Sequence, residues 1–209
     1  MPRDRLELPV PPGVSTVCSR DAAQGSAGIF SPLDVCAKDS RVAEGNALTF
    51  TSRAMTEPTA IFGPINVHLN AIRDATDGYW SVTVNDVAPD GTSTVLSTGQ
   101  LPASIRAVDE ARVCARRAAI TPHRSIRSPW TACCPSSRET RSRWILRSSR
   151  PRPRWHPEHR LRVDVFTANP PKALAFRPML NATEFKTQYL RFDPDTPSFI
   201  NLPTNRPIG

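Results

Sequence analysis

The stretch YWSVTVNDVAPDGTSTVLSTG, residues 79 to 99, decides the fold class of this chain. Alternate positions from Trp80 to Val84 are apolar and the positions between them are polar, which is the period-2 pattern of a half-buried strand. The tripeptide Pro89-Asp90-Gly91 then predicts a tight turn, because proline presets φ and glycine accepts a positive φ. Apolar Val95-Leu96 continues the return strand. The stretch therefore predicts a β-hairpin.

The same alternation recurs before and after this hairpin. It is found in ALTFTS from Ala47, in GPINVHLNAI from Gly63 and in HRLRVDVF from His159. Turn residues separate these segments, and no convincing amphipathic helix lies between them. This pattern predicts an all-β sandwich or barrel. The proline-punctuated end of the chain is predicted to lie as an extended tail over the sandwich.

The positive charge of the chain is concentrated in one segment. The formal net charge is +8, but residues 111–160 hold 13 Arg against two Glu, or about +11, and the remaining 14 basic and 17 acidic residues sum to about −3. No apolar run approaches the roughly 18 residues of a spanning helix. The N-terminal residues have no apolar signal segment, which predicts either a cytoplasmic protein or the tail of a longer one and leaves the compartment open.

Three ordered blocks resemble a known family. They are LTFTS with MTEPTAIFGPINVHL, then DGYWSVTVNDVAPDGTSTVLSTGQLPASIRAVDEA, then HRLRVDVFTANPPKALAFRPML. The chain resembles the C-terminal jelly-roll domain of the X-Pro dipeptidyl-peptidase and cocaine-esterase (CocE/NonD) class of serine hydrolases. The resemblance implies a non-catalytic jelly-roll β-sandwich that supports an α/β-hydrolase catalytic domain of the parent protein, with a homo-oligomer as a further option. The serine triad of such enzymes belongs to the catalytic domain, so no catalytic residue is carried over.

The resemblance divides the chain into four parts. We expect an extended lead-in, the first part of the sandwich, an aberrant basic segment, and the last strands with the tail, over residues 1–45, 46–111, 112–158 and 159–209. The family has further strands and glycine-containing loops where the basic segment stands. We interpret residues 112–158 as an out-of-frame reading of GC-rich coding DNA, restored just before His159, with Glu158 in the position of the family's glycine. Without strand periodicity, this segment is expected to be irregular or disordered.

Two other interpretations of the basic segment stay open. It can be a solvated basic loop. It can also be an arginine-rich arm that neutralises phosphates while Trp130, Trp144 and Trp155 stack on bases. The segment interrupts a strand pattern, whereas such arms mostly lie at chain ends, so a nucleic-acid partner is not the favoured interpretation.

The chain offers no recognisable catalytic triad. A nucleophile elbow requires G-x-S-x-G at a strand-to-helix turn, and the surroundings of Ser26 and Ser93 both miss this pattern. Ser93 is predicted to follow a hairpin turn, and His68 is predicted on the polar face of a strand. We therefore expect no catalytic residue in this chain, although the parent is a hydrolase.

No metal or cofactor site is predicted. Cys133 and Cys134 are adjacent, which prevents the spacing with which two thiolates reach one zinc ion, and proline stiffens the pair His156 and His159. No calcium loop fits the aspartates of the hairpin region, namely Asp74, Asp77, Asp86 and Asp90. Turn capping explains the aspartates beside Gly78 and Gly91.

Two expectations depend on context that the residues leave open. Cys18 and Cys36 lie in family-like text and are a possible disulfide if the parent is exported, with buried free thiols as the alternative. A free-standing carbohydrate- or ligand-binding sandwich is the alternative function. It would need an exposed aromatic platform, which Tyr79 and Trp80 are the candidates to supply.

Overall fold

The computed structural model describes the strand-forming part of the chain in detail. The residues it describes are 6–10, 39–63, 65–105, 114–116, 120–123, 139–148, 154–167, 184, 186–205 and 208. The elements, in chain order, are β1 (Leu6–Val10), α3 (Arg41–Glu44), β2 (Leu48–Ala54), β3 (Thr59–Ala60), β4 (Ile65–Arg73), β5 (Tyr79–Val87), β6 (Ser93–Pro102), the short helix η1 (Ala103–Ile105), β7 (Cys114–Arg116), β8 (Ile120–His123), β9 (Glu139–Ser148), β10 (Arg154–Trp155), β11 (Arg160–Phe166), β12 (Gln188–Phe192) and β13 (Phe199–Asn201).

The hairpin that the sequence predicts is formed by β5 and β6. The two strands pair antiparallel from Tyr79 with Pro102 to Val87 with Ser93. In the turn between them Gly91 has a φ of +86°, and its N–H donates to the carbonyl of Ala88 at 2.9 Å. Because a positive φ is strained for residues with a Cβ, glycine at this position fits the turn. The predicted role of Gly91 is confirmed.

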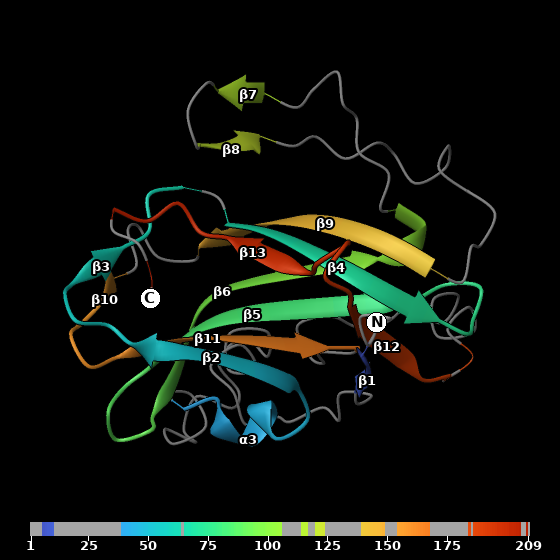
Figure 1. Cartoon of the computed structure of the whole chain (residues 1–209). Helices are drawn as coiled ribbons and strands as arrows, with labels where there is room; N and C mark the ends of the chain where they lie inside the picture. The colour runs from blue at the N-terminus through green and yellow to red at the C-terminus, as the bar shows by residue number, and fades with distance from the viewer. Residues whose placement is uncertain are drawn as a thin grey trace, which may run out of the picture.

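The strands form an all-β sandwich, as expected from the sequence. The strand order is β1-β12-β4-β9-β6-β5-β11-β2, and β13 pairs with β4 beside β12. One sheet contains β1, β12, β13 and β4, and the other contains β6, β5, β11 and β2. Strand β9 pairs with β4 on one side and with β6 on the other, so it joins the two sheets along one side of the sandwich (Figure 1). The opposite side has no such joining strand among the described residues.

Apolar side chains of both sheets meet in the core. The alternating residues Ile65, Val67 and Leu69 of β4 are buried, as are alternate residues of β5 from Trp80 to Val84. These apolar positions form the core, as the period-2 pattern predicts. The polar positions between them are nearly all buried as well, so the expectation that these strands are half-buried is corrected. The polar face of β4 is also covered, because the tail returns over it. Asn70 donates from its backbone N–H to Ser198 Oγ at 2.9 Å, and β13 pairs with β4 from Phe199 onward.

The basic segment differs from the expectation of an irregular conformation. Residues 139–148 form β9, which pairs with β4 over eight positions, and β10 pairs with β3. Trp155 at the end of this segment is fully buried. The physical reason is that β4 and β6 both present backbone N–H and C=O groups at the side where the sheets join. Any extended segment can satisfy these groups, whatever its side-chain pattern.

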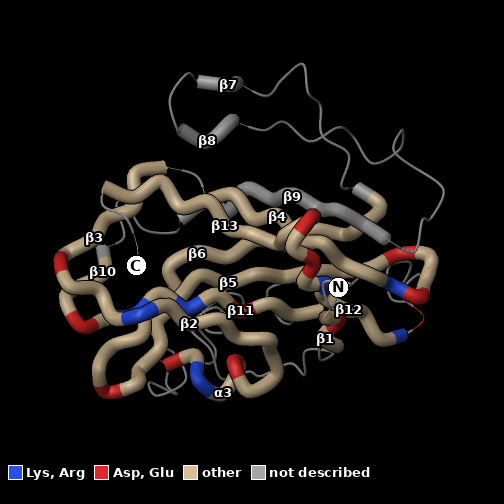
Figure 2. Tube along the Cα trace, viewed as in Figure 1, with Lys and Arg blue, Asp and Glu red and all other residues tan. Residues whose placement is uncertain are grey.

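Charged residues of the described part of the chain gather at the two ends of the sandwich and around α3 (Figure 2). The middles of the strands are mostly uncharged, which fits a core buried between two sheets. In the described part of the chain, no helix has the length and apolar character needed to cross a membrane.

Candidate functional site

Residues from two of the family-like blocks meet where β5 lies beside β11. The strands pair antiparallel, with Leu161 opposite Asp86 and Asp164 opposite Thr83. At the end of this pairing, His159 Nδ1 lies 2.7 Å from Asp86 Oδ1. Both side chains are largely buried. The pair therefore ties the entry of β11 to β5, a contact between residues more than 70 positions apart that the sequence analysis did not foresee.

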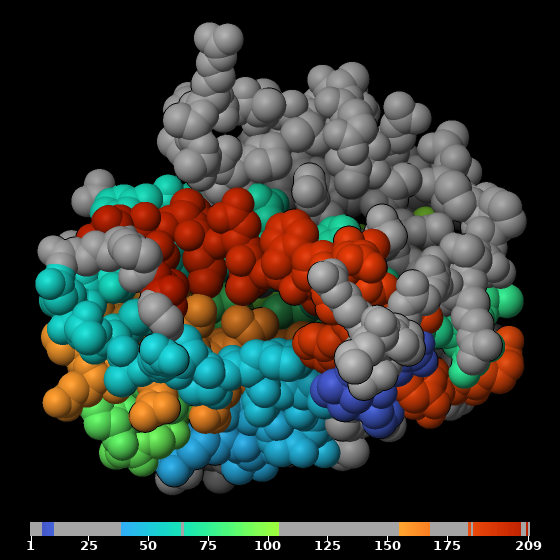
Figure 3. All heavy atoms as spheres, viewed as in Figure 1, coloured from blue at the N-terminus to red at the C-terminus, as the bar shows by residue number. Residues whose placement is uncertain are grey.

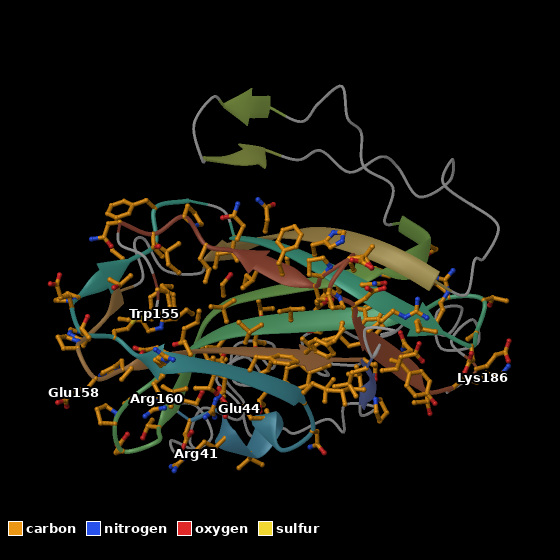
Figure 4. The ribbon with its side chains drawn as sticks, viewed as in Figure 1. Arg41, Glu44, Trp155, Glu158, Arg160 and Lys186 are labelled. Atoms are coloured by element: carbon orange, nitrogen blue, oxygen red, sulfur yellow. The ribbon has the colours of Figure 1, made fainter. Side chains whose placement is uncertain are left out.

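A tight turn delivers His159 to this pair. The N–H of Glu158 donates to the carbonyl of Met55 at 2.8 Å, and the N–H of Met55 donates to the carbonyl of His159 at 2.7 Å. Glu158 has a φ of +67°, in the left-handed region that favours glycine. Figure 4 shows Glu158 at the outer end of this turn, away from the sheets. Glu158 thus occupies a turn position whose backbone conformation favours glycine.

A cluster of buried polar side chains lies further along the same two strands. Asn85 Nδ2 donates to Glu44 Oε1 at 3.0 Å and also to Asp164 Oδ2. Thr83 Oγ1 donates to the same Asp164 oxygen at 3.0 Å, while Arg162 Nη1 donates to Glu44 Oε2 at 2.5 Å. In Figure 4, Glu44 lies between α3 and the strands β2 and β11. These five residues, the polar cluster, attach α3 to the outer face of the sheet.

Asp164 is the most perturbed group of the polar cluster. Its side chain is fully buried, and its Oδ1 has no hydrogen-bond partner. Burial, together with the nearby Glu44 carboxylate, raises the pKa of Asp164 to about 7. Desolvation disfavours the charged carboxylate, and a second negative charge disfavours it further. The cluster therefore holds a carboxyl that changes its protonation near neutral pH.

The segment before α3 is fixed to the start of β6. Asp39 Oδ1 accepts from the backbone N–H of Arg41 at 3.1 Å and from that of Ser93 at 3.2 Å. Burial acts to raise the pKa of Asp39, but the hydrogen bonds from Arg41 and Ser93 outweigh it and hold this pKa below its usual value. The ionised carboxylate of Asp39 is thus the form that the fold stabilises.

The described serine and histidine side chains are not arranged for nucleophilic catalysis. Ser93 is fully buried, and its Oγ has no hydrogen-bond partner, so no imidazole activates it. His68 lies on β4, where its ring stacks on Phe199 with centroids 5.0 Å apart. Ser26 lies outside the described residues. Among the residues with described side chains, the hydrogen bonds of the site hold neighbouring strands together. The carboxyl of Asp164 is the group that can exchange a proton.

The structure describes some of the candidate metal ligands and leaves others outside the described residues. The rings of His156 and His159 are 5.4 Å apart, whereas Cys133 and Cys134 lie outside the described residues. Within the part of the chain that is described, no group of three or more His, Cys, Asp or Glu could hold a metal ion. The disulfide between Cys18 and Cys36 also concerns residues outside the described part and stays a prediction.

Two of the aspartates act as turn caps, as predicted. Asp77 Oδ1 accepts from the backbone N–H of Gly78 at 2.7 Å and from that of Ser104 at 2.9 Å. Asp90 Oδ1 accepts from the backbone N–H of Thr92 at 2.9 Å. Asp86, in contrast, is the partner of His159 and not a cap.

The aromatic platform required by the alternative function is not present at the expected residues. Tyr79 and Trp80 are only 6% and 1% exposed. Burial also raises the pKa of Tyr79, whose hydroxyl donates to Gln100 Oε1 at 2.6 Å. The expectation of an exposed platform at these residues is therefore corrected, because both side chains are buried, and Trp80 belongs to the core cluster between the sheets. Trp155 is likewise buried and cannot stack on bases, and Trp130 lies outside the described residues.

Comparison with known protein families identifies the family of this chain. The family model of the X-Pro dipeptidyl-peptidase C-terminal non-catalytic domain matches residues 11–128, which is more than half of the chain. The chain belongs to this family. The match includes the β5–β6 hairpin with Asp86 and ends before the segment that contains His159. None of the curated proteins compared with the chain matches it.

Solved structures with the same fold are parts of larger hydrolases. An alpha-amino acid ester hydrolase is 22% identical with a TM-score of 0.58, over 80% of this chain and 27% of its own. A CocE/NonD family hydrolase from Staphylococcus aureus is 14% identical with a TM-score of 0.59, over 80% of this chain and 32% of its own. An aminopeptidase from a marine sediment Thaumarchaeota archaeon is 18% identical with a TM-score of 0.62, over 95% of this chain and 33% of its own. The non-catalytic domain thus spans about a third or less of these chains.

Proposed function

We propose that this chain is the supporting β-sandwich of a serine hydrolase of the X-Pro dipeptidyl-peptidase and acyl-esterase type. The observation that carries the proposal is the family match over residues 11–128. In this role the sandwich packs on an α/β-hydrolase catalytic domain and helps to wall its substrate site. The His159–Asp86 pair and the polar cluster supply rigidity to the sheet that contains β5 and β11, which a supporting domain requires.

Hydrolysis assays test the non-catalytic part of this proposal. The purified chain is incubated with p-nitrophenyl esters and with X-Pro p-nitroanilides. We expect no release of chromophore above the rate of a buffer blank, because Ser93 is buried away from any imidazole. Ser26→Ala and Ser93→Ala variants serve as controls. Turnover by the parent chain, whether or not these variants abolish it, would contradict a non-catalytic domain.

A chimera tests the supporting role. The catalytic part of the alpha-amino acid ester hydrolase whose structure matches is joined to this chain in place of its own matched domain. We expect the chimera to be more soluble and to have a higher melting temperature than the truncated enzyme without any sandwich. An unrelated β-sandwich of similar length, joined at the same point, is the control. Equal solubility and melting temperature of the two fusions would contradict a specific supporting role.

We also infer that the basic segment, predicted over residues 112–158, contains an out-of-frame part within this domain. Because the family match runs to residue 128, the inference concerns residues 129–158. Two described residues near its end support this inference. Glu158, where the sequence resemblance places glycine, has a φ of +67°, and the buried indole Nε1 of Trp155 has no hydrogen-bond partner. A left-handed non-glycine residue and an unpaired buried N–H are both unfavourable, so they mark a segment poorly matched to its place.

The coding DNA tests this inference directly. A one-base shift across residues 129–158 should restore a strand pattern and place glycine before His159. A protein made from the restored frame should then unfold in a sharper cooperative transition than the present chain, measured by circular dichroism. A codon sequence that gives no strand pattern in either shifted frame would contradict the inference.

A further inference from the structure

A hollow between the two sheets is left where one sheet is narrower than the other. Strands β12 and β13 pair with different parts of β4, at residues 71–73 and 66–68. Strand β1 continues the sheet only beside β12. Beside β13 no further strand follows among the described residues, while the facing sheet continues through β11 to β2. Figure 3 shows the resulting hollow between the red atoms of β13 and the cyan atoms of β2.

The walls of the hollow are apolar. They are formed by Val67 and Leu69 of β4, Val163 and Val165 of β11, and Leu190 of β12, together with aromatic residues at the rim. The polar side chain in the lining is Ser198. Its Oγ accepts from the N–H of Asn70 at 2.9 Å and lies 3.5 Å from the carbonyl of Arg191, so its hydroxyl is already engaged. The lining therefore offers a guest neither a charge nor a disengaged hydrogen-bonding group.

Size and rim composition restrict the guest further. The hollow has a volume of about 250 Å³. An apolar cavity of about 150 Å³ holds benzene, and drug-sized ligands need roughly 300 Å³ or more. The guest is thus larger than benzene and smaller than a drug. The rings of Phe50 and Phe192 are 5.7 Å apart at the rim and tilted by 51°, a geometry in which an added flat ring can stack or meet an edge.

We infer that the hollow bounded by β2, β11, β12 and β13 is a binding site for a small uncharged aromatic molecule with two fused rings. The hydrophobic effect supplies the binding free energy, since apolar walls and an apolar guest both leave water. A charged substituent on the guest would lose its hydration without gaining a partner in this lining. The site should therefore discriminate strongly against anions of the same ring size. The inference is independent of the proposed function, because it rests on the shape and lining of the hollow alone.

The test uses the full chain with methyl groups labelled for NMR, and naphthalene as the probe. We expect saturable shifts of the methyl signals of Val67, Val165 and Leu190, and no shift at Val42, which lies 57% exposed on α3. Naphthalene-2-sulfonate at the same concentration should bind at least tenfold more weakly. Shifts absent from the three lining residues, or equal affinity for the sulfonate, would overturn the inference.

Variants distinguish the hollow from a surface patch. Ile200 of β13 also lines the hollow. Ile200→Phe adds a ring there and should weaken naphthalene binding at least tenfold, whereas Val42→Phe adds the same ring to α3 and should leave it unchanged. Phe50→Ala removes a rim ring from a residue that is 37% exposed, so it tests the site even if Ile200→Phe does not fold. We expect at least threefold weaker binding for Phe50→Ala. Parent-like affinity in Phe50→Ala, or in folded Ile200→Phe, would overturn the inference.

Discussion

The pairing of β5 with β11 and the pairing of β4 with β9 hold the same kind of sheet together by different means. Strands β5 and β11 have alternating side chains, a hydrogen-bonded His159–Asp86 pair and the polar cluster. Strand β9 comes from a basic segment without strand periodicity, and it pairs over as long a stretch of backbone. The difference shows that backbone hydrogen bonding can place a strand that its side chains do not specify.

The side chains and the backbone of the basic segment are poorly matched near its end. Residues near its end combine an unpaired buried indole N–H at Trp155 with a left-handed backbone at Glu158. In the β5–β6 hairpin, by comparison, the residue with positive φ is Gly91, and Asp90 caps the turn. At these two positions with positive φ, glycine fits the backbone of the hairpin turn, whereas glutamate does not fit the backbone of the turn after the basic segment.

The largest effect is expected from breaking β9. Ile145→Pro removes a backbone N–H and inserts a ring in the strand that joins the two sheets, at a position paired with Asn66. Proline is excluded from central strands for this reason. We expect the variant to lose its cooperative unfolding transition, followed by circular dichroism during heating, because most of the roughly 5–15 kcal/mol of a domain's stability depends on both sheets.

A proline at an isolated hairpin is the matched control. Ala115→Pro lies in β7, which among the described residues pairs with β8 alone. This variant should lower the free energy of unfolding by less than about 1 kcal/mol, the range of substitutions away from the core. If Ile145→Pro melts like Ala115→Pro, then β9 does not join the sheets and the basic segment contributes no pairing.

The second effect concerns pH and the polar cluster. The pKa of Asp164 is raised to about 7, above the value of 3.8 that an unfolded chain gives it. Between these values the folded state binds more protons at this carboxyl than the unfolded state does, so the contribution of Asp164 to stability is greatest at low pH and falls as pH rises from about 4 to 7. The loss from this group is on the order of 4 kcal/mol over that range.

Urea denaturation at a series of pH values measures this loss. Asp164→Asn removes the titrating carboxyl and should make the free energy of unfolding less dependent on pH between 4 and 7. Asp74→Asn, at an exposed position in the loop after β4, is the control and should keep the slope of the parent chain. A parent slope that persists in Asp164→Asn would mean that another group causes it.

The third effect tests the contact between two family-like blocks. His159→Ala and Asp86→Ala each remove one partner of the 2.7 Å contact, and the double variant removes both. We expect each single variant to lose roughly 1–2 kcal/mol and the cycle to show a coupling of about 1 kcal/mol, as for a partly buried hydrogen bond to a charged group. Additive losses in urea titrations would show that the two side chains do not interact.

The smallest effect has the opposite sign. Glu158→Gly should raise the free energy of unfolding by about 0.5–1 kcal/mol, because glycine adopts the observed φ of +67° without strain. Glu57→Gly, which replaces a glutamate without a positive φ, should instead be neutral or lower the stability. A destabilised Glu158→Gly chain, measured by thermal unfolding, would contradict both the left-handed turn and the position assigned to the family's glycine.

The sequence by itself determined the alternating strands, the β5–β6 turn and the family. These follow from local patterns, since strand period and turn chemistry are read within a few residues. The tertiary structure decided the burial of Tyr79 and Trp80, the raised pKa of Asp164 and the meeting of His159 with Asp86. It also decided that β9 joins the sheets. Each of these features depends on which distant strands become neighbours. The side-chain pattern of one segment does not tell which backbone groups of another segment are left without a hydrogen-bond partner.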